Sequence, residues 1–231
     1  MRNSASQLVV VTGLCLTIGF SWGCMGTPVY RMWHRSEWVK DEEERPSLHT
    51  RLEELAQLRS RADSMSEAEQ AQVATNLARS LTDDPTPLYR AQVIRTMGEL
   101  STPAATEALR TAIHDPEPSV RIAACAAWGR RAGDESIPVL AEVLGKDAEL
   151  DVRIAAARAL ENYRTPDVVP ALGVALDDAN PALQHRAIRS LEAVTGKNFG
   201  NNVPAWRQYV RTGTEDPSAV PSLAERVRDL F

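Results

Sequence analysis

The chain contains one unit that is copied at a nearly constant interval, and this copying restricts the folds open to it. The copies begin at aspartates that lie 31, 32 and 31 residues apart. These aspartates are Asp84, Asp115, Asp147 and Asp178. Repetition at such a period is typical of a helical array, in which each unit packs only against its neighbours, and not of a single closed core.

The apolar residues within each copy predict two helices. In the first, apolar side chains recur at i, i+4, i+7 and i+8, as at Val152, Ala156, Ala159 and Leu160. In the second, paired apolar residues keep one register through the copies: Leu109/Ile113, Leu140/Leu144 and Leu172/Leu176. Leu77 and Leu81 keep this register too, so we expect the array to span residues 66–195, starting at a capping box formed by Ser66 and Glu69.

The repeated pattern resembles a known family. Asp-x-x-x-x-Val-Arg-x-x-Ala-x-x-Ala-Leu/Trp, followed by a turn and Ile/Val-Pro-x-Leu, is similar to HEAT repeats of the short bacterial kind, shared with phycobilisome-lyase HEAT-like proteins. The resemblance implies an all-α fold, a right-handed α-α superhelix of the HEAT/ARM-like solenoid type with about four repeats.

Composition and spacing divide the remainder of the chain into flanking segments. We expect a signal peptide or membrane anchor at 1–24, a flexible tether at 25–46 and an N-terminal capping helix at 47–65. Beyond the repeats, we expect a C-terminal cap at 196–211, then a linker and a terminal amphipathic helix at 212–231. The Thr-Gly, Phe-Gly and Trp combination in that cap is similar to the tails of planctomycete HEAT-repeat lipoproteins.

The N-terminal segment predicts export or membrane attachment. Leu8 to Phe20 is apolar, and Gly23-Cys24 resembles the end of a bacterial lipobox, although Ser21 and Trp22 depart from its pattern. The resemblance implies lipidation of Cys24; an uncleaved signal anchor and plain secretion are the alternatives. In each case we expect the protein outside the cytoplasm, at the cell envelope, with the lipidated or uncleaved form facing the periplasm or exterior.

Charge and cysteine content exclude some functions. The net charge of −5 gives no global basis for nucleic-acid binding. The three cysteines form no disulfide framework and no zinc-ligand pattern, and Cys125 lies among alanines as a small core thiol.

The aspartates and the arginines that follow them form the most conspicuous polar series. Arg90, Arg121 and Arg153 each lie six residues after an aspartate, and Gln184 takes the fourth arginine position. This ladder could bind an extended ligand. We favour the alternative, in which each aspartate caps a helix start and pairs with an arginine of a neighbouring repeat.

A partner surface is expected on the second helices, where HEAT arrays usually bind. Val168 and Val174 remain after the inward positions are filled, and Glu107, Arg110 and Glu142 lie on the same series of helices. An exposed apolar strip there would mark a partner site. The alternative is that the helix of residues 218–231 folds back over it.

Motifs for catalysis are missing from the sequence. The four histidines form no His-Glu pair, whereas HEAT-repeat deoxyhypusine hydroxylases, which resemble this fold, carry paired His-Glu iron ligands. We therefore predict no cofactor or metal and a non-catalytic binding module that docks an unidentified protein or peptide. The alternative is an enzyme, or a lyase-like accessory factor, with an unrecognised surface site.

Overall fold

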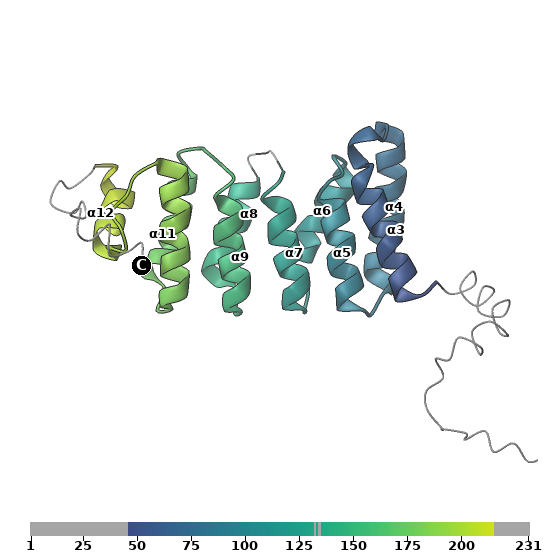
Figure 1. Ribbon diagram of the computed structural model, residues 1–231, viewed down its shortest axis with the longest axis horizontal. Coiled ribbons are helices and arrows are strands. Elements are labelled where there is room, and N and C mark those ends of the chain that lie inside the picture. Colours follow the sequence, from purple (N-terminus) through teal and green to yellow (C-terminus); the bar gives the residue numbers. More distant parts are fainter. Residues whose placement is uncertain (1–45, 132, 134, 215–231) are drawn as a thin grey trace, which may run out of the picture. The chain divides into compact units, whose positions relative to one another are not determined.

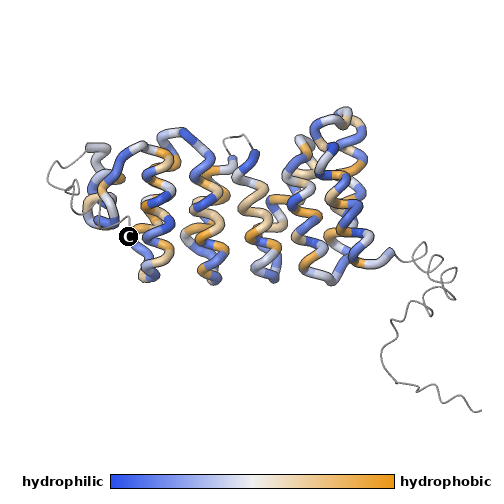
Figure 2. Tube along the Cα trace, in the orientation of Figure 1, coloured by the Kyte–Doolittle hydropathy of each residue, from blue (hydrophilic) through white to orange (hydrophobic). Residues whose placement is uncertain are grey.

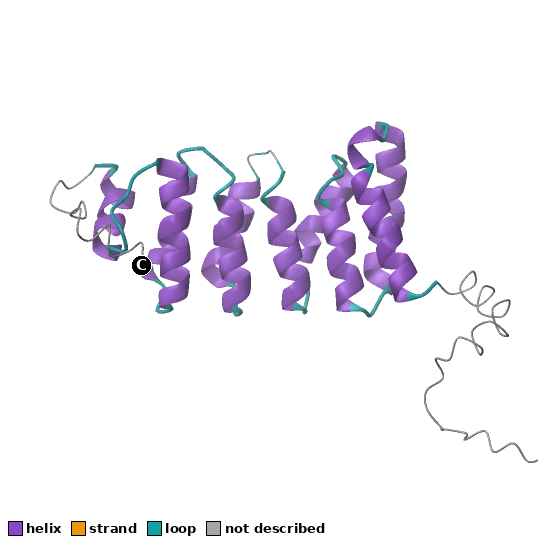
Figure 3. Ribbon diagram, viewed as in Figure 1, coloured by secondary structure: helices purple, strands orange, loops and turns teal. Residues whose placement is uncertain are grey.

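The computed structural model describes residues 46–131, 133 and 135–214, and every regular element in these ranges is helical (Figures 1 and 3). The elements are α3 (Leu48–Ser60), η1 (Ala62–Ser64), α4 (Glu67–Asp83), α5 (Pro87–Met97), α6 (Pro103–Ala112), α7 (Pro118–Trp128), α8 (Ser136–Lys146), α9 (Leu150–Leu160), α10 (Val168–Gly173), η2 (Val174–Asp177), α11 (Pro181–Thr195) and α12 (Val203–Thr212).

The helices alternate between two rows. The first helices of the pairs, α3, α5, α7, α9 and α11, pack side by side in one row (Figure 1). In the other row α4 packs on α6, α8 packs on α10, and α10 packs on α12. The prediction of an all-α solenoid is therefore confirmed.

Local sequence signals set where the helices begin and end. Ser66 and Glu69 form the expected capping box, in which the Ser66 hydroxyl accepts a hydrogen bond from the Glu69 N–H. Pro87, Pro118 and Pro181 occupy the first turns of α5, α7 and α11, where a missing N–H costs little. The last two long helices, α11 and α12, end at the left-handed glycines Gly196 and Gly213.

The core lies between the two rows, and apolar residues recur in every helix along it (Figure 2). The paired residues of the second helices from Leu109 to Leu176 are buried, and most of them are fully inaccessible. Leu77 is buried as well, and Leu81 is partly buried against the same core. Small residues on the first helices, such as Ala124 and Ala156, are fully buried, which lets neighbouring helices approach closely.

The C-terminal end of the array differs from the copies before it. The fourth second helix is split into α10 and the short 3₁₀ helix η2. Beyond α11, Phe199 packs edge-on against Trp206 with ring centroids 4.8 Å apart, and Tyr209 closes the aromatic cluster. Trp206 is fully buried and donates to the carbonyl of Gly200 at 3.0 Å. Large apolar side chains thus cover the last helix pair.

None of the helices between residues 46 and 214 is both long and apolar enough to cross a membrane. The anchor expected at 1–24, the lipidation site Cys24, the tether at 25–46 apart from Pro46, and the terminal helix at 218–231 lie outside the described residues.

Candidate functional site

The aspartates and arginines of the repeats form ion pairs from one repeat to the next. The Nε and Nη2 atoms of Arg90 donate to the two carboxylate oxygens of Asp115 at 3.0 and 2.9 Å. Arg121 binds Asp147 in the same way at 2.8 and 2.9 Å. Arg153 reaches Asp178 through Nη2 alone, at 3.4 Å. The two bidentate contacts, those of Arg90 and Arg121, have the strongest geometry open to an arginine and a carboxylate.

Each member of the ladder also fixes the turn of its own repeat. One oxygen of Asp115 accepts the N–H of Glu117 at 2.9 Å, and Asp147 accepts that of Glu149 at 2.9 Å. Arg121 donates Nη1 to the carbonyl oxygens of Asp115 and Pro116 at 2.9 and 3.1 Å. The ladder residues are therefore engaged by protein atoms at both ends, and the expected pairing between neighbouring repeats is present. The aspartates do not occupy the N-cap positions of the following helices, which are held by Thr86, Glu117, Glu149 and Asn180.

The ladder starts one repeat earlier than its sequence register indicates. Arg51 of α3 forms an ion pair with Asp84, and its guanidinium lies 3.7 Å from the centroid of the Tyr89 ring. Leu77 and Leu109 occupy the same position in successive repeats. Arg51 lies 26 residues before Leu77, whereas Arg90 lies 19 residues before Leu109. Because these two spacings differ, the repeat period does not predict that Arg51 belongs to the ladder.

The ladder ends at Gln184. The Gln184 side-chain amide donates to the backbone carbonyl of Asp178 at 2.8 Å. Arg121 makes the equivalent hydrogen bond to the carbonyl of Asp115. Arg207 of α12 instead pairs with Asp177 at 2.7 Å.

The ion pairs change the acidity of two aspartates. Burial on its own would raise the pKa of Asp147, but hydrogen bonds from Arg121 and from the Glu149 N–H outweigh it, and the pKa is lowered. The pKa of Asp84 is lowered for the same reasons, with Arg51 and Thr86 as the donors. Both carboxylates are thus held in the charged form that the ladder requires.

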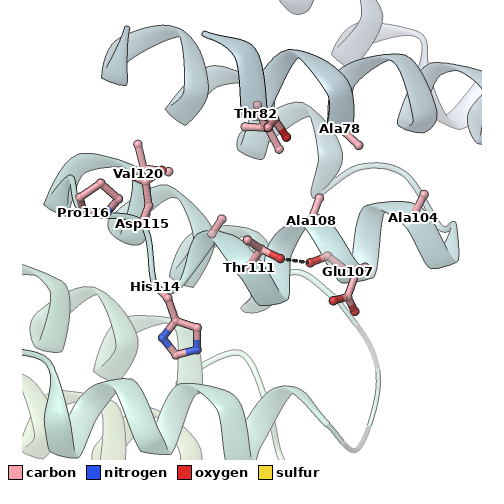
Figure 4. Close-up of a pocket in the computed structure, with 12 residues that line it drawn as sticks. Ala78, Thr82, Ala104, Glu107, Ala108, Thr111, His114, Asp115, Pro116 and Val120 are labelled. Atoms are coloured by element: carbon pink, nitrogen blue, oxygen red, sulfur yellow. Dashed lines mark hydrogen bonds between the residues drawn. The ribbon is translucent and has the colours of Figure 1, made fainter. Parts of the chain in front are cut away.

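A groove of about 630 Å³ lies between α4 and α6, in the second-helix row. Its lining is mostly small and apolar, from Ala78, Leu81, Thr82, Ala104, Glu107, Ala108, Thr111, Ala112, His114, Asp115, Pro116 and Val120. Figure 4 shows Ala78 and Thr82 on one side of it and Ala104 and Ala108 on the other. The two charged residues of this lining, Glu107 and Asp115, are both acidic, which suits an apolar ligand with a cationic end.

The polar side chains that line the groove differ in the hydrogen bonds and ion pairs that they already make. The Asp115 carboxylate is engaged by Arg90 and by Glu117 N–H. Glu107 is exposed and pairs with Arg110 at 3.3 Å, while its backbone carbonyl accepts the Thr111 hydroxyl at 3.1 Å (Figure 4). The ring of exposed His114 is turned away from Ala78 and Thr82 in that view. In the same view the Glu107 carboxylate also lies on the side of α6 away from Ala78 and Thr82, so Glu107 stands at the rim of the groove as its exposed carboxylate.

Of the residues predicted as a partner surface, one is buried and the others lie on second helices. Val168 is fully buried at the start of α10, because it faces the core between the rows, and it is unavailable to a partner. Val174 on η2 is 51% exposed, Glu107 and Arg110 lie on α6, and Glu142 lies on α8. The groove lining on α4 was missed because its small alanines and threonines resemble ordinary helix residues in sequence.

The donor set for a metal is also lacking in the described part of the chain. No group of three or more His, Cys, Asp or Glu side chains there could hold a metal ion. The one histidine followed by an acid is His114, and its neighbour Asp115 is committed to Arg90. The residues present between positions 46 and 214 therefore do not fit the paired His-Glu iron ligands that the resemblance to deoxyhypusine hydroxylases implies.

Comparisons with known proteins place this geometry in context. A family model described as HEAT repeats matches residues 74–161 and 143–229. A curated deoxyhypusine hydroxylase of Candida albicans is 28% identical over 168 residues, which cover 72% of this chain and 51% of that protein. The chain thus spans about half the length of this curated relative. A structure of human deoxyhypusine hydroxylase in complex with glycerol has a TM-score of 0.47 and 22% identity, covering 54% of this chain and 44% of that chain.

The similarity to an enzyme contradicts the prediction of a non-catalytic binding module, and with it the prediction that the protein is not an enzyme. The sequence argument relied on missing motifs, and a site on the surface of a helical array needs no motif of fixed spacing. The missing His-Glu pairs counted against the very enzyme to which the chain proves similar.

Proposed function

Because the chain belongs to the HEAT-repeat family, we propose that the array presents the site of an enzymatic function. The protein is either the catalyst or the accessory factor that holds the substrate for one, and the α4–α6 groove is the substrate site. The observation that carries this proposal is the 168-residue alignment with a curated enzyme.

The groove suits the substrate that the relative's name gives. Deoxyhypusine is an aliphatic amine, and the groove offers an apolar floor of alanines with the carboxylate of Glu107 at its edge. Methylene groups would lie against Ala104 and Ala108, and an ammonium group would pair with Glu107 in place of Arg110. We therefore propose a deoxyhypusine-type amine as the substrate.

No step of the proposal passes through iron, since the described donor set does not fit an iron centre. What this chain's own residues contribute is binding and orientation. A concave wall of fixed helices holds the substrate's aliphatic part, and one carboxylate fixes the position of its amine.

The test uses the full-length protein and a deoxyhypusine-containing peptide, with the same peptide carrying lysine as a control. Binding is measured by titration calorimetry, and conversion is followed by mass spectrometry, alone and with a competent deoxyhypusine hydroxylase added. We expect preferential binding of the deoxyhypusine peptide, together with conversion by the protein or faster conversion by the added enzyme. Equal binding of both peptides with no effect on conversion would overturn the proposal.

A groove-filling variant locates the site. Thr111→Trp places a large side chain on the exposed side of the groove, and we expect it to weaken peptide binding about tenfold or more. Ala126→Trp, at an exposed position on α7 in the other row, is the matched control and should bind normally. If both variants bind like the parent protein, the substrate does not occupy this groove.

We also propose that the protein works at the cell envelope, held through residues 1–24 as in planctomycete HEAT-repeat lipoproteins. The support is in the sequence: the apolar stretch from Leu8 to Phe20 and the pair Gly23-Cys24. The intact mass of the native protein tests this. A diacylglyceryl group on Cys24 supports lipidation, whereas a full-length chain or a free cleaved terminus indicates the anchor or the secreted form.

A further inference from the structure

An exposed apolar strip lies at the C-terminal end of the second-helix row, away from the groove. Val174 of η2 is 51% exposed, one of three large apolar residues with such exposure in the described part of the chain. Next to it, Val210 of α12 is only partly buried. We call Val174 and Val210, with the glycines beneath them, the valine strip.

Glycines keep the valine strip shallow and continuous across three helices. A Cβ added to Gly145 of α8 would lie 3.5 Å from Val174 Cγ1, so Val174 rests over the end of α8. A Cβ on Gly173 would lie 2.5 Å from Val210 Cγ1, so α10 and α12 approach closely there. Val174 and Val210 therefore place apolar side chains between the end of α8 and α12.

We infer that residues 215–231 of the same chain cover this strip. The described chain leaves α12 at Gly213, directly beside Val210 in the fold. The family model continues past that point to residue 229, so the segment that follows belongs to the repeat-containing region. Its apolar residues, Val220, Leu223, Val227, Leu230 and Phe231, recur at the spacing of one helix face.

The length of the segment matches the strip. Residues 215–231 would span about 25 Å as a helix. Neighbouring helices pack about 8–10 Å apart, so the strip from α12 across η2 to α8 extends about 20 Å. An occupant tethered at Gly213 also has a far higher effective concentration at the strip than a separate molecule.

Amide hydrogen exchange on the full chain tests this inference. In the full chain we expect slow exchange in η2 and α12, and about tenfold faster exchange there in a variant that ends at Thr214. Val174→Arg in the full chain should give the same faster exchange, because a buried guanidinium without a partner would expel the segment. Leu88→Arg, on α5 and 52% exposed, is the matched control and should leave η2 and α12 unchanged.

Combining the truncation after Thr214 with Val174→Arg distinguishes loss of the packed segment from a general destabilisation of η2 and α12. In the variant that ends at Thr214, Val174→Arg should have no further effect, since the occupant is already gone. Additive effects would overturn the inference, as would identical exchange in the full and shortened chains. A dimer by light scattering whose dissociation removes the protection would assign the strip to a second copy and overturn it as well. None of these results depends on substrate binding in the α4–α6 groove.

Discussion

The guanidinium of Arg121 and the carboxylate of Asp147 meet through two parallel hydrogen bonds of 2.8 and 2.9 Å, although they belong to different repeats. Both side chains are largely buried, with 13% and 8% exposed. The pair connects the first helix of one repeat to the turn that begins the next. Repeats in such an array are stable mainly through their interfaces, so this contact bears on the whole row.

Removing the carboxylate should destabilise the array. Asp147→Asn leaves the buried Arg121 without its counter-charge, and we expect a loss of about 2–4 kcal/mol in the free energy of unfolding. Urea denaturation followed by circular dichroism measures it. Glu142→Gln breaks only the exposed Lys146 pair on α8 and should cost less than about 0.5 kcal/mol. Equal effects of the two changes would show that the ladder contributes no more than a surface pair.

Acid should weaken the ladder. The pKa values of Asp84 and Asp147 are lowered in the folded protein from an ordinary value of 3.8. A carboxyl whose folded pKa is depressed contributes stability that is present above its unfolded pKa and is lost as the pH falls through the folded value. Urea midpoints should therefore drop below about pH 4, and the drop should be smaller in Asp147→Asn. An equally steep drop in that variant would assign the acid sensitivity to other groups.

The close approach of α7 and α9 should make a side chain at Gly129 destabilising. A Cβ on Gly129 would lie 2.8 Å from Ala159 Cβ and 2.9 Å from its Cα, so α7 and α9 would have to separate. We expect Gly129→Ala to cost about 1–3 kcal/mol. Gly145→Ala meets only Val174 Cγ1 at 3.5 Å, and as a helical position it should stabilise by up to about 1 kcal/mol. Thermal unfolding of the two variants compares them; a shift of the same sign in both would contradict the packing argument.

The thiol of Cys125 should be inert in the native protein. Burial raises the pKa of Cys125 to about 12, and the side chain is fully inaccessible to solvent. Because the thiolate is the reactive form, iodoacetamide at mildly alkaline pH should modify Cys125 only after denaturation. Peptide mass spectrometry distinguishes it from Cys15 and Cys24. Rapid native labelling at Cys125 would mean that α7 opens far more often than its packing indicates.

The sequence by itself determined the fold class and the register of the array. Leu109, Leu140 and Leu172 are buried where their period placed them, because a repeated unit faces nearly the same environment in each copy. The same periodicity found the ladder from Asp84 to Asp178, since each aspartate and each arginine recurs with its turn.

Only the tertiary structure decided what departs from the period or lies between helices. Arg51 pairs with Asp84 although its spacing differs from that of the other arginines, and Val168 is buried although Val174, further along the same stretch, is exposed. The α4–α6 groove exists because Ala78 and Ala104, far apart in sequence, leave space between two helices. Periodicity specifies which face of a helix is buried, whereas a concave surface depends on the distance between helices, which the packing of the whole array sets.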